Sequence, residues 1–344
     1  MKDVKEGIVL GVCNALLDIS ANVDEQFLKK YNLERDNAIL AEPQHMPIYD
    51  DLITHFNPDY IAGGSVQNSL RVAQWILEKP NITVYFGCVG DDKYAKILEE
   101  RAKADGVNVQ YQHTSEAPTG TCAVLVTNTH RSLCANLAAA IHFSIDHIQK
   151  PENKKLIDNA EYYYISGFFV AVSVPTIIEI AKTALEHNRL FIMNLSAPYI
   201  PLAFKDALEE CLPYVDIIFG NEGEAEAFAQ AQNWDTKDLR EIGKKMLQLP
   251  KANKKRSRVV ILTQGKDPVL LIEKDKISEF NVPLLEHDKM VDTNGAGDAF
   301  VGGFIGQLVQ GKSFDVCIRC GIWAARQIIQ RSGCTFEGKA DFKE

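Results

Sequence analysis

The sequence lacks the features that mark membrane and secreted proteins. None of its apolar runs approaches the roughly 20 residues that a helix needs to cross a bilayer. Residues 1–6 carry charges of both signs, where a secreted protein would have an apolar signal segment. We therefore expect a cytoplasmic protein without a membrane partner, and the sequence leaves the nucleus open as a second compartment.

Basic tracts are also scarce, and the formal net charge of the 344 residues is −9. A protein that binds nucleic acid neutralises phosphates with clustered Lys and Arg. The single cluster of this kind runs from Lys251 to Arg258, between a helical and a strand-like run. We interpret it as a solvated loop, with a nucleic-acid or localisation patch as the alternative. No nucleic-acid partner is expected.

The eight cysteines lack the pairing that a zinc site requires. Most of them lie inside apolar runs, which is typical of buried free thiols in a reducing compartment. Cys317 and Cys320 form the single CxxC pair, one helical turn apart, without a second pair or a His cluster. Since structural zinc takes four ligands, we do not expect a zinc site.

Internal repeats and low-complexity linkers are absent, and the chain shows instead a regular alternation of short apolar runs with amphipathic stretches. This alternation is typical of βαβ units. We predict an α/β fold with a doubly wound, mainly parallel central sheet and helices on both faces. The predicted strands are 8–12, 83–88, 162–165, 190–195, 217–219, 259–263, 269–272 and 277–282, with a short one at 290–291. The predicted helices are 66–78, 94–105, 174–187, 222–232, 236–247, 299–309 and 316–329.

Two regions, 20–61 and 117–139, break this rhythm and are more strand-like and irregular. We predict that they build a small β-rich lid over the C-terminal edge of the parallel strands, where open α/β sheets bind ligands. The pattern alone does not separate such a lid from ordinary surface insertions. The predicted organisation is one unit, 1–344, with a lid from roughly 15–62 and 116–140 and a large α/β domain from the remainder.

The seven residues 292–298, with the sequence DTNGAGD, lie between a strand-like and a helix-like run. Backbone N–H groups in the first turn of a helix have no intrahelical partner, and the helix dipole favours an anion there. Gly295, Ala296 and Gly297 are small enough to let a phosphate approach that backbone. Because a plain phosphate cradle would avoid a carboxylate, we predict that Asp298 takes a proton from a hydroxyl while the cradle holds the phosphoryl group.

Two segments in the first fifth of the chain are candidates for holding a sugar. Gly63 and Gly64 precede the helix 66–78, and Asn68 lies about one turn into it. A Gly-Gly pair brings backbone close to a ligand, although such turns are also common for structural reasons alone. Asp18 follows the first strand, where an aspartate usually caps or turns the chain. Alternatively, its carboxylate accepts from two vicinal ribose hydroxyls.

Three further segments suit phosphate or metal binding. Asn221 and Glu224 begin the helix 222–232, where an acid usually complements the dipole. Magnesium also takes one or two carboxylates and keeps most of its waters. Thr263 and Gly265 end a strand in a turn that either accepts a nucleotide or holds no ligand. Arg131, in the second irregular region, could clamp phosphate oxygens when a lid closes.

Gly63-Gly64 with Asn68, together with DTNGAGD at 292–298, resembles the two signatures of the ribokinase-like, or PfkB, family of carbohydrate and nucleoside kinases. The NEGE run at 221–224 is similar to that family's magnesium-linked NxxE element. The resemblance covers nearly the whole chain, and stretches such as CNALLDISA, GGSVQNS, PTGTCAVLV and RSLCANLAAA resemble the eukaryotic members that act on adenosine. It implies transfer of the γ-phosphoryl group of ATP to the 5′-hydroxyl of adenosine, by a monomer that uses Mg²⁺.

The resemblance also implies roles for individual residues. Asp298 would be the catalytic base above an anion hole of Gly295, Ala296 and Gly297, and Arg131 would meet the phosphates. On the ATP side lie Thr263 and Gly265, with Asn221 and Glu224 organising magnesium through water.

On the nucleoside side, Asp18, Gly64 and Asn68 would hold the ribose hydroxyls. Phe169 would stack on the purine in an apolar slot. The full nucleoside set is Asn14, Leu16, Asp18, Gly63, Gly64, Ser65, Asn68, Cys122, Leu133, Ala135, Leu137, Phe169 and Asn294.

Two positions depart from the pattern of this family. Ala15 stands where relatives often have proline, which makes the connection into the lid less rigid. Ile322 replaces a more familiar histidine near the expected donor nucleotide, so adenine recognition on the ATP side is expected to differ. The rival hypotheses are another sugar or nucleoside kinase of the family, a non-catalytic nucleoside-binding protein, and a dinucleotide oxidoreductase. The last is disfavoured because a Gly-x-Gly-x-x-Gly turn is missing after the first strand.

Overall fold

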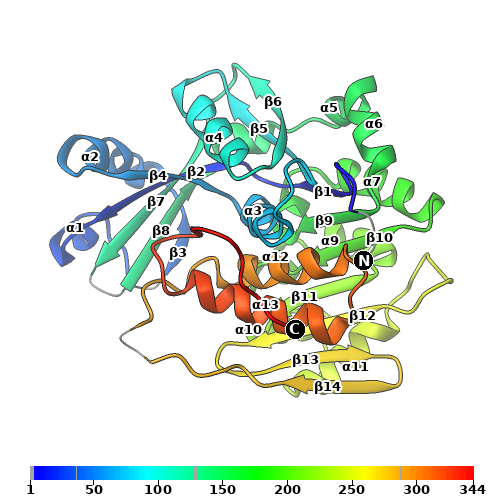
Figure 1. Ribbon diagram of the computed structural model, residues 1–344. Helices are drawn as coiled ribbons and strands as arrows, with labels where there is room; N and C mark the ends of the chain where they lie inside the picture. Colours follow the sequence, from blue (N-terminus) through cyan, green and yellow to red (C-terminus); the bar gives the residue numbers. More distant parts are fainter. Residues whose placement is uncertain (1–3, 36, 128–129, 287–288) are drawn as a thin grey trace.

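The larger of two β-sheets runs through the molecule and sets the positions of most helices (Figure 1). The computed structural model describes residues 4–35, 37–127, 130–286 and 289–344. The nine strands of this sheet are β1 (Val9–Val12), β5 (Thr83–Gly90), β6 (Asn108–Thr114), β9 (Tyr162–Ser166), β10 (Leu190–Asn194), β11 (Ile217–Asn221), β12 (Val259–Gln264), β13 (Asp267–Glu273) and β14 (Lys276–Phe280). Their order is β14-β13-β12-β11-β10-β9-β1-β5-β6. Neighbours from β6 to β12 are parallel, whereas β12, β13 and β14 form an antiparallel meander at one edge.

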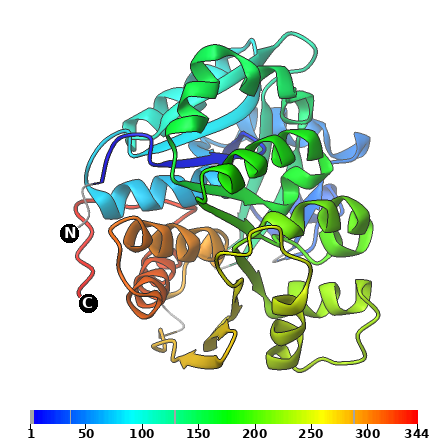
Figure 2. The ribbon, with the colours of Figure 1, turned by 90° about the vertical axis from the view of Figure 1, so that its right-hand side faces the viewer.

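Helices cover both faces of this sheet (Figure 2). On one face lie α3 (Ser65–Leu77), α12 (Ala296–Leu308) and α13 (Phe314–Ile328). On the other lie α5 (Ile145–Gln149), α6 (Pro151–Asn159), α7 (Val174–Glu186), α8 (Tyr199–Ala203), α9 (Lys205–Cys211), α10 (Glu222–Ala231) and α11 (Leu239–Gln248). The strands between the layers are nearly continuous apolar runs, and every residue of β5 and β9 is buried. Parallel sheets that are covered on both faces have this pattern.

Close packing fixes α12, the helix that follows the DTNGAGD motif. A Cβ added to Gly302 would lie 2.5 Å from the carbonyl oxygen of Ser69 in α3, and one added to Gly303 would lie 2.7 Å from that of Cys320 in α13. Real Cβ atoms do not approach backbone so closely, so these glycines let α12 lie against both neighbours. The N-terminus of α12 is thereby held in a defined place beside α3.

The second sheet contains β2 (Leu16–Asn22), β3 (Ala38–Leu40), β4 (Asp59–Gly63), β7 (Gly120–Thr127) and β8 (His130–Asn136). Its order is β3-β8-β7-β2-β4, and it lies to the left of the main sheet in Figure 1. The helices α1 (Glu25–Lys30) and α2 (Pro47–His55) cover one of its faces through a separate apolar cluster. The helix α4 (Lys93–Ala104) packs against strands of both sheets. The predicted fold class is confirmed, and the division into a lid and a large domain stays a prediction.

Several predicted elements differ from the structure. The segment before the motif was predicted to be a strand at 290–291, but β14 ends at Phe280 and no strand is described between there and α12. The helix α12 begins at Ala296, three residues earlier than predicted, so Asp298 lies in its first turn. The edge strand β6 and the short helices α5, α6, α8 and α9 were not predicted. The structure also has 3₁₀ turns η1 (Pro43–His45), η2 (Ala138–His142), η3 (Gly167–Ala171) and η4 (Leu212–Tyr214).

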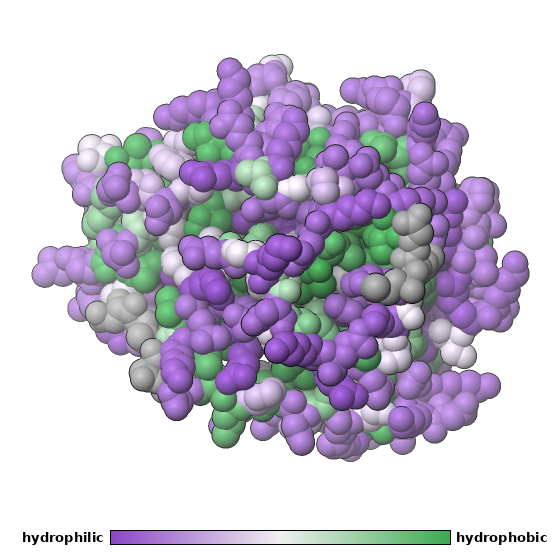
Figure 3. Space-filling view, in the orientation of Figure 1, coloured by the Kyte–Doolittle hydropathy of each residue, from purple (hydrophilic) through white to green (hydrophobic). Residues whose placement is uncertain are grey.

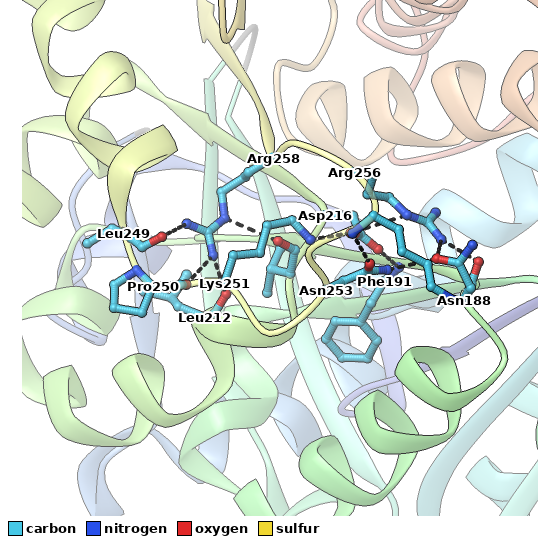
Figure 4. Close-up of polar contacts among 12 residues, drawn as sticks. Asn188, Phe191, Leu212, Asp216, Leu249, Pro250, Lys251, Asn253, Arg256 and Arg258 are labelled. Carbon is cyan, nitrogen blue, oxygen red and sulfur yellow. Dashed lines mark hydrogen bonds and ion pairs between the residues drawn. The ribbon is translucent and has the colours of Figure 1, made fainter.

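The basic cluster at 251–258 is not the solvated loop that we predicted (Figure 4). Lys251 donates to Oδ1 of the buried Asp216 at 2.5 Å, and the Nε atom of Arg256 lies 3.7 Å from the same oxygen. Asp216 Oδ2 accepts the backbone N–H of Phe191 at 3.0 Å. Lys251 and Arg256 therefore turn inward, together with Arg258, and the exposed basic residues of this stretch are Lys254 and Lys255.

The guanidinium of Arg258 is fully buried, and within the described ranges its hydrogen bonds all go to backbone carbonyls, at 2.6–3.1 Å (Figure 4). The acceptors belong to Leu212, Val215, Met246, Leu249 and Pro250. Burial lowers the pKa of Arg258 to about 10, with Asp216 opposing the shift. The guanidinium thus stays charged at neutral pH. It links the segments that precede β11 and β12 to the C-terminal end of α11.

The surface is mostly hydrophilic on the face shown in Figure 3, with apolar residues visible between the polar ones. Within the described ranges, no helix combines the length and apolar character required to span a membrane.

We predict that Arg258→Met lowers the free energy of unfolding by about 3 kcal/mol or more. The reason is that each buried carbonyl left without a donor costs about 1–3 kcal/mol. Urea denaturation followed by circular dichroism measures the change. The control is Lys254→Met, which alters an exposed residue of the same loop and should stay within about 0.5 kcal/mol of wild type. Equal midpoints for the two variants would contradict the structural role of Arg258.

Candidate active site

The turn before α12 is held by a buried aspartate. Asp292 Oδ1 accepts the backbone N–H of Asn294 at 2.9 Å, and Oδ2 accepts the backbone N–H of Gly333 at 2.9 Å. Gly295 then caps α12 with φ of +77°, in the left-handed region that glycine tolerates best. Asp292 is 3% exposed, and sequence analysis gave it no role.

The first turn of α12 offers backbone N–H groups to a ligand. Among the described residues, no backbone acceptor is recorded for the N–H groups of Gly295, Gly297 and Asp298. The N–H of Ala296 already donates to the carbonyl of Thr293 at 3.3 Å. A Cβ at Gly297 would meet nothing within 4 Å, so open space lies beside it. The N–H groups of Gly295, Gly297 and Asp298 are thus available at this turn and that of Ala296 is engaged, whereas their role as an anion hole stays a prediction.

Two donors from α3 hold the carboxylate of Asp298. Ser65 Oγ donates to Oδ1 at 2.7 Å, and Asn68 Nδ2 donates to Oδ2 at 3.1 Å. Burial raises the pKa of Asp298 to about 6, and these two hydrogen bonds limit the rise. Ser65 and Asn68 were predicted to touch a nucleoside, but here they touch the candidate base. Asp298 is thus mostly ionised at pH 7 and close to its titration range.

Asp18 lies on β2 beside the Gly63–Gly64 turn. A Cβ at Gly63 would lie 2.2 Å from Asp18 Oδ1, so only glycine leaves room for this carboxylate. Gly64, with φ of +90°, is the N-cap of α3. Burial raises the pKa of Asp18 to about 7; nearby Arg71 opposes the shift and Asp298 adds to it. No hydrogen bond to the Asp18 carboxylate is recorded among the described residues, so its oxygens are available to a ligand.

The predicted apolar slot lies on one face of the second sheet. Asp18 is paired with Cys122 on β7, and Cys122 with Ala135 on β8. Side chains alternate along strands, so Leu16 and Leu133 share their face, opposite the one that α1 and α2 cover. A Cβ at Gly120 would lie 2.6 Å from both Leu16 Cδ2 and the carbonyl oxygen of Leu137, which places Leu137 at the same end. The structure therefore brings these predicted residues together.

Asn14, between β1 and β2, has an unsatisfied buried atom. The residue is 6% exposed, and its Oδ1 accepts no hydrogen bond within the described part of the chain. A buried polar atom without a partner is costly, which suits a position where a ligand hydroxyl donates. The carbonyl of the same residue lies where a Cβ of Gly64 would be, at 2.4 Å. This supports the predicted place of Asn14 in the nucleoside site.

Arg131, which was predicted to clamp phosphate oxygens when a lid closes, is buried. It lies on β8, is 3% exposed, and its Nε is 2.9 Å from Asp292 Oδ2. Its Nη2 donates to Ser332 Oγ at 2.8 Å. The guanidinium therefore links the second sheet to the turn before α12. A contact between Arg131 and phosphate stays a prediction.

Phe169 contradicts the prediction that it stacks on a purine. Its side chain is 0% exposed and packs edge-to-face on Phe143, with ring centroids 5.4 Å apart. The 3₁₀ turn η3 directs Phe169 into the main core, so neither ring face is open. Its neighbour Phe168 is half-buried and lies 6.2 Å from the ring of Tyr199. The sequence Phe168-Phe169 does not indicate which of the two rings faces the core.

A cavity of about 680 Å³ opens between β11, β12, α10, α12 and α13. The residues predicted on the ATP side line it together with two residues of the predicted anion hole. The first set is Asn221, Glu224, Thr263, Gly265 and Ile322, and the second is Ala296 and Gly297. Apolar residues of 282–285 and α13 form another part of its wall, including Val282, Leu284, Leu285, Ala325 and Ile329. The cavity is large enough for a small-molecule ligand.

Two cations at this cavity were missed by sequence analysis. Lys266 is exposed directly after Gly265, and Arg326 on α13 donates from Nη2 to the carbonyl of Leu284 at 3.2 Å. Lys266 could have been found, since it follows a turn already singled out. Arg326 could not, because it reads as an ordinary polar residue of an amphipathic helix. Both suit a polyphosphate.

Asn221 and Glu224 form a reciprocal capping box at the start of α10. The N–H of Glu224 donates to Asn221 Oδ1 at 2.8 Å, and the N–H and Nδ2 of Asn221 donate to the Glu224 carboxylate at 3.0 and 2.9 Å. Burial raises the pKa of Glu224 to about 7. No group of three or more His, Cys, Asp or Glu suited to a metal is found among the residues described. Since Mg²⁺ needs only one or two carboxylates, this buried acid beside the cavity still fits it through water.

The match to known proteins decides the family. Residues 36–340 match the family described as pfkB family carbohydrate kinase. The chain belongs to the pfkB family of carbohydrate kinases. The anion-binding turn, Asp298 and the cavity are therefore the candidate active site of a pfkB-family kinase.

Several relatives are similar over their full length. Adenosine kinase 1 of Arabidopsis thaliana is 50% identical over 337 residues, covering 98% of each chain. A crystal structure of Anopheles gambiae adenosine kinase in complex with P1,P4-di(adenosine-5) tetraphosphate is 58% identical, with a TM-score of 0.93, and covers 98% of this chain and 100% of that one. Adenosine kinase from Schistosoma mansoni in complex with adenosine and AMP is 36% identical, with a TM-score of 0.90 and coverage of 98% and 100%.

We predict that Asp18→Asn stabilises the ligand-free protein at pH 8 but not at pH 5. A carboxyl whose pKa is raised by folding to about 7 favours the folded state at low pH, and this contribution is lost as pH rises through 7. Asparagine cannot ionise and avoids that loss. Thermal unfolding at pH 5 and pH 8 measures the difference, with the exposed Asp59→Asn on neighbouring β4 as control. A lower melting temperature for Asp18→Asn at pH 8 would show that Asp18 is not a destabilised site residue.

Proposed function

We propose that this protein is an adenosine kinase, which transfers the γ-phosphoryl group of ATP to the 5′-hydroxyl of adenosine to give AMP and ADP. The observation that carries the proposal is the position of Asp298 between two sites. Its helix N-terminus lines the cavity of about 680 Å³, while the charge of its carboxylate raises the pKa of Asp18 on the second sheet. The names and complexes of the full-length relatives supply the identity of the two substrates.

On the acceptor side, the ribose binds between β2 and α3. Asp18 has free carboxylate oxygens for two hydroxyls, and Asn14 Oδ1 has a free acceptor position. The base lies on the apolar face that carries Leu16, Cys122 and Ala135. Because Phe169 is buried, stacking on that ring is not part of this proposal. The 5′-hydroxyl then points to Asp298.

Phosphoryl transfer requires positioning and charge stabilisation more than a strong base. Ionised Asp298 accepts a hydrogen bond from the 5′-hydroxyl and then its proton. The backbone N–H groups of Gly295, Gly297 and Asp298 face the oxygens of the γ-phosphoryl group, where negative charge is stabilised by the helix dipole. Because an ionised carboxylate has about four acceptor positions, Asp298 can accept the 5′-hydroxyl while Ser65 and Asn68 still donate to it.

Magnesium is proposed to act with ATP on the cavity side. Asn221 and Glu224 would hold it through water, and it would neutralise phosphate charge in the transfer. Glu224 is buried and its pKa is raised, so a nearby cation would favour its ionised form.

We also propose a cytoplasmic monomer that works in purine salvage. Its support is the similarity of the chain to adenosine kinases over nearly its whole length. Sedimentation equilibrium of the purified protein tests the oligomeric state.

The substrate test compares adenosine, guanosine, ribose and fructose as acceptors, with ADP formation as the readout. We expect kcat/KM to be highest for adenosine. Faster turnover of a free sugar would make the protein a sugar kinase of the same family. Adenosine binding by calorimetry without any ADP release would make it a non-catalytic nucleoside-binding protein.

We predict that Asp298→Asn lowers kcat by about 10²–10⁴-fold, the usual contribution of a general base. Adenosine affinity should change much less, since the ribose contacts remain. Single-turnover kinetics and calorimetry separate the two effects. Asp315→Asn, in the first turn of α13 with a side chain 51% exposed, makes the same change at another helix start and should leave kcat intact. Near-wild-type turnover of Asp298→Asn would remove the base assignment.

We predict that kcat/KM for adenosine falls as pH is lowered through 7 to 6. The groups responsible are Asp18, with a pKa of about 7, and Asp298, with a pKa of about 6, both of which must be ionised. The acid limb of kcat/KM reports groups of the free enzyme. The profile is measured at saturating ATP between pH 5 and 9. Constant kcat/KM down to pH 5 would be inconsistent with this electrostatic description.

A further inference from the structure

Arg71 is a buried cation in α3 that sequence analysis did not single out. Its side chain is 5% exposed, and its Nε donates to Asp105 Oδ2, at the end of α4, at 2.6 Å. Its Nη1 donates to the carbonyls of Ala62 at 2.7 Å and Cys334 at 3.1 Å. The guanidinium also lies over the ring of Phe336, 5.6 Å from its centroid. One side chain thus joins α3 to α4, to the strand before the Gly63–Gly64 turn, and to the segment after α13.

The same Nη1 lies 3.3 Å from Asn68 Oδ1, one turn earlier on α3. This contact decides which way the amide of Asn68 points, because a guanidinium offers only donors. The amide oxygen faces Arg71, so Nδ2 is left to donate to Asp298 Oδ2 at 3.1 Å. If the amide were reversed, its oxygen would face the carboxylate and its nitrogen would face a cation. Arg71 therefore selects the orientation in which Asn68 supports the candidate base.

Of the cations near Asp18, Arg71 has the larger effect in opposing the rise of its pKa. The charges that face Asp18 are Arg71 and Arg131 as cations and Asp292 and Asp298 as anions. Asp105 lies on the far side of Arg71 and is partly exposed. Cys334, with a pKa raised to about 12, and Tyr111, with a pKa raised by burial, stay neutral across the working range. Loss of the Arg71 charge would therefore leave two carboxylates near Asp18 and one cation.

We infer that Arg71 is a positioning residue of the acceptor site, which orients the Asn68 amide toward Asp298 and supplies the positive charge that keeps Asp18 ionised. The inference rests on the proposed function, because its consequence is measured on adenosine phosphorylation. Arg71 touches neither substrate; it acts through Asn68 and through the field at Asp18. Both ends of the acceptor site therefore depend on one guanidinium: Asp18, which binds the ribose, and Asp298, which acts as the base.

Two substitutions separate these effects. Arg71→Lys keeps the charge but loses the planar fork that meets Asn68 and the carbonyls. We expect kcat/KM for adenosine to fall roughly 10- to 100-fold, as misplaced reacting groups do, with the acid limb of the pH profile near its wild-type position. Arg71→Met loses both functions, so kcat/KM should fall at least as far and the acid limb should move to higher pH. KM for ATP should stay within about twofold of wild type, since the cavity does not include this residue.

The path through Asn68 is tested with a double-mutant cycle. If Arg71 acts by orienting Asn68, the loss caused by Arg71→Lys should largely disappear in the Asn68→Ala background. Additive losses in the cycle would overturn the path through Asn68. Because Arg71→Met removes a buried charge and could unfold the protein, the cycle uses the lysine variant, and thermal unfolding confirms that each protein is folded at the assay temperature.

Asp105→Asn is the matched control. It removes the ion pair at Nε but leaves the contacts of Nη1 with Asn68, Ala62 and Cys334. We expect lower thermal stability with wild-type kcat/KM and an unchanged acid limb. If Asp105→Asn reproduces the loss of Arg71→Lys, the role of Arg71 is structural and the inference is wrong. Wild-type kcat/KM in both Arg71 variants would also overturn it, whereas absence of AMP formation by the wild-type protein would instead refute the proposed function.

Discussion

The contact between α3 and the first turn of α12 is the interaction on which the rest of the site depends. Ser65 and Asn68 are more than 200 residues from Asp298 in the sequence, yet they hold its carboxylate from one side. This is possible because Gly302 lets α12 approach the backbone of α3 more closely than any larger residue would. Once α12 is placed in this way, its N-terminus faces the cavity of about 680 Å³ and Asp298 faces the second sheet. Geometry that looks like a local property of seven residues is in fact set by helix packing.

The sequence predicted the parts of the molecule in which local pattern and tertiary environment agree. The buried parallel strands of the sheet centre are apolar runs, and the helices α3 and α7 are long and amphipathic, so both were predicted with small boundary errors. The residues on one face of the second sheet were implied by the family resemblance, whereas the strand register that places Asp18 beside Cys122 is seen only in the structure. Position relative to solvent was not predictable: Phe169 turns into the core, and Arg131 and Arg258 are buried by partners far away in the chain. Nothing in a neighbouring residue encodes such partners.

Buried charge is used differently at the two ends of the central sheet. Asp216 and Arg258, before β11 and β12, are satisfied by cations and carbonyls, so burial there joins elements together. At the opposite end, burial raises the pKa values of Asp18, Asp298 and Glu224, and no cation forms an ion pair with any of the three within the described part of the chain. Carboxylates in that state destabilise the fold at neutral pH and gain most from a ligand that donates hydrogen bonds or brings a cation. The distribution of unsatisfied charge thus marks the functional edge of the sheet.

The ion pair between Arg131 and Asp292 has a consequence for how the sequence can diverge. The side chains are 3% and 1% exposed, and Asp292 also holds Asn294 and Gly333 by their backbone N–H groups. Replacing either residue alone leaves a charge buried without its partner, which typically costs 3–5 kcal/mol. A substitution at one position is therefore destabilising unless the other position changes at the same time. Although they are 161 residues apart in the sequence, the two positions can change only together, so the second sheet and the turn before α12 are constrained to evolve together.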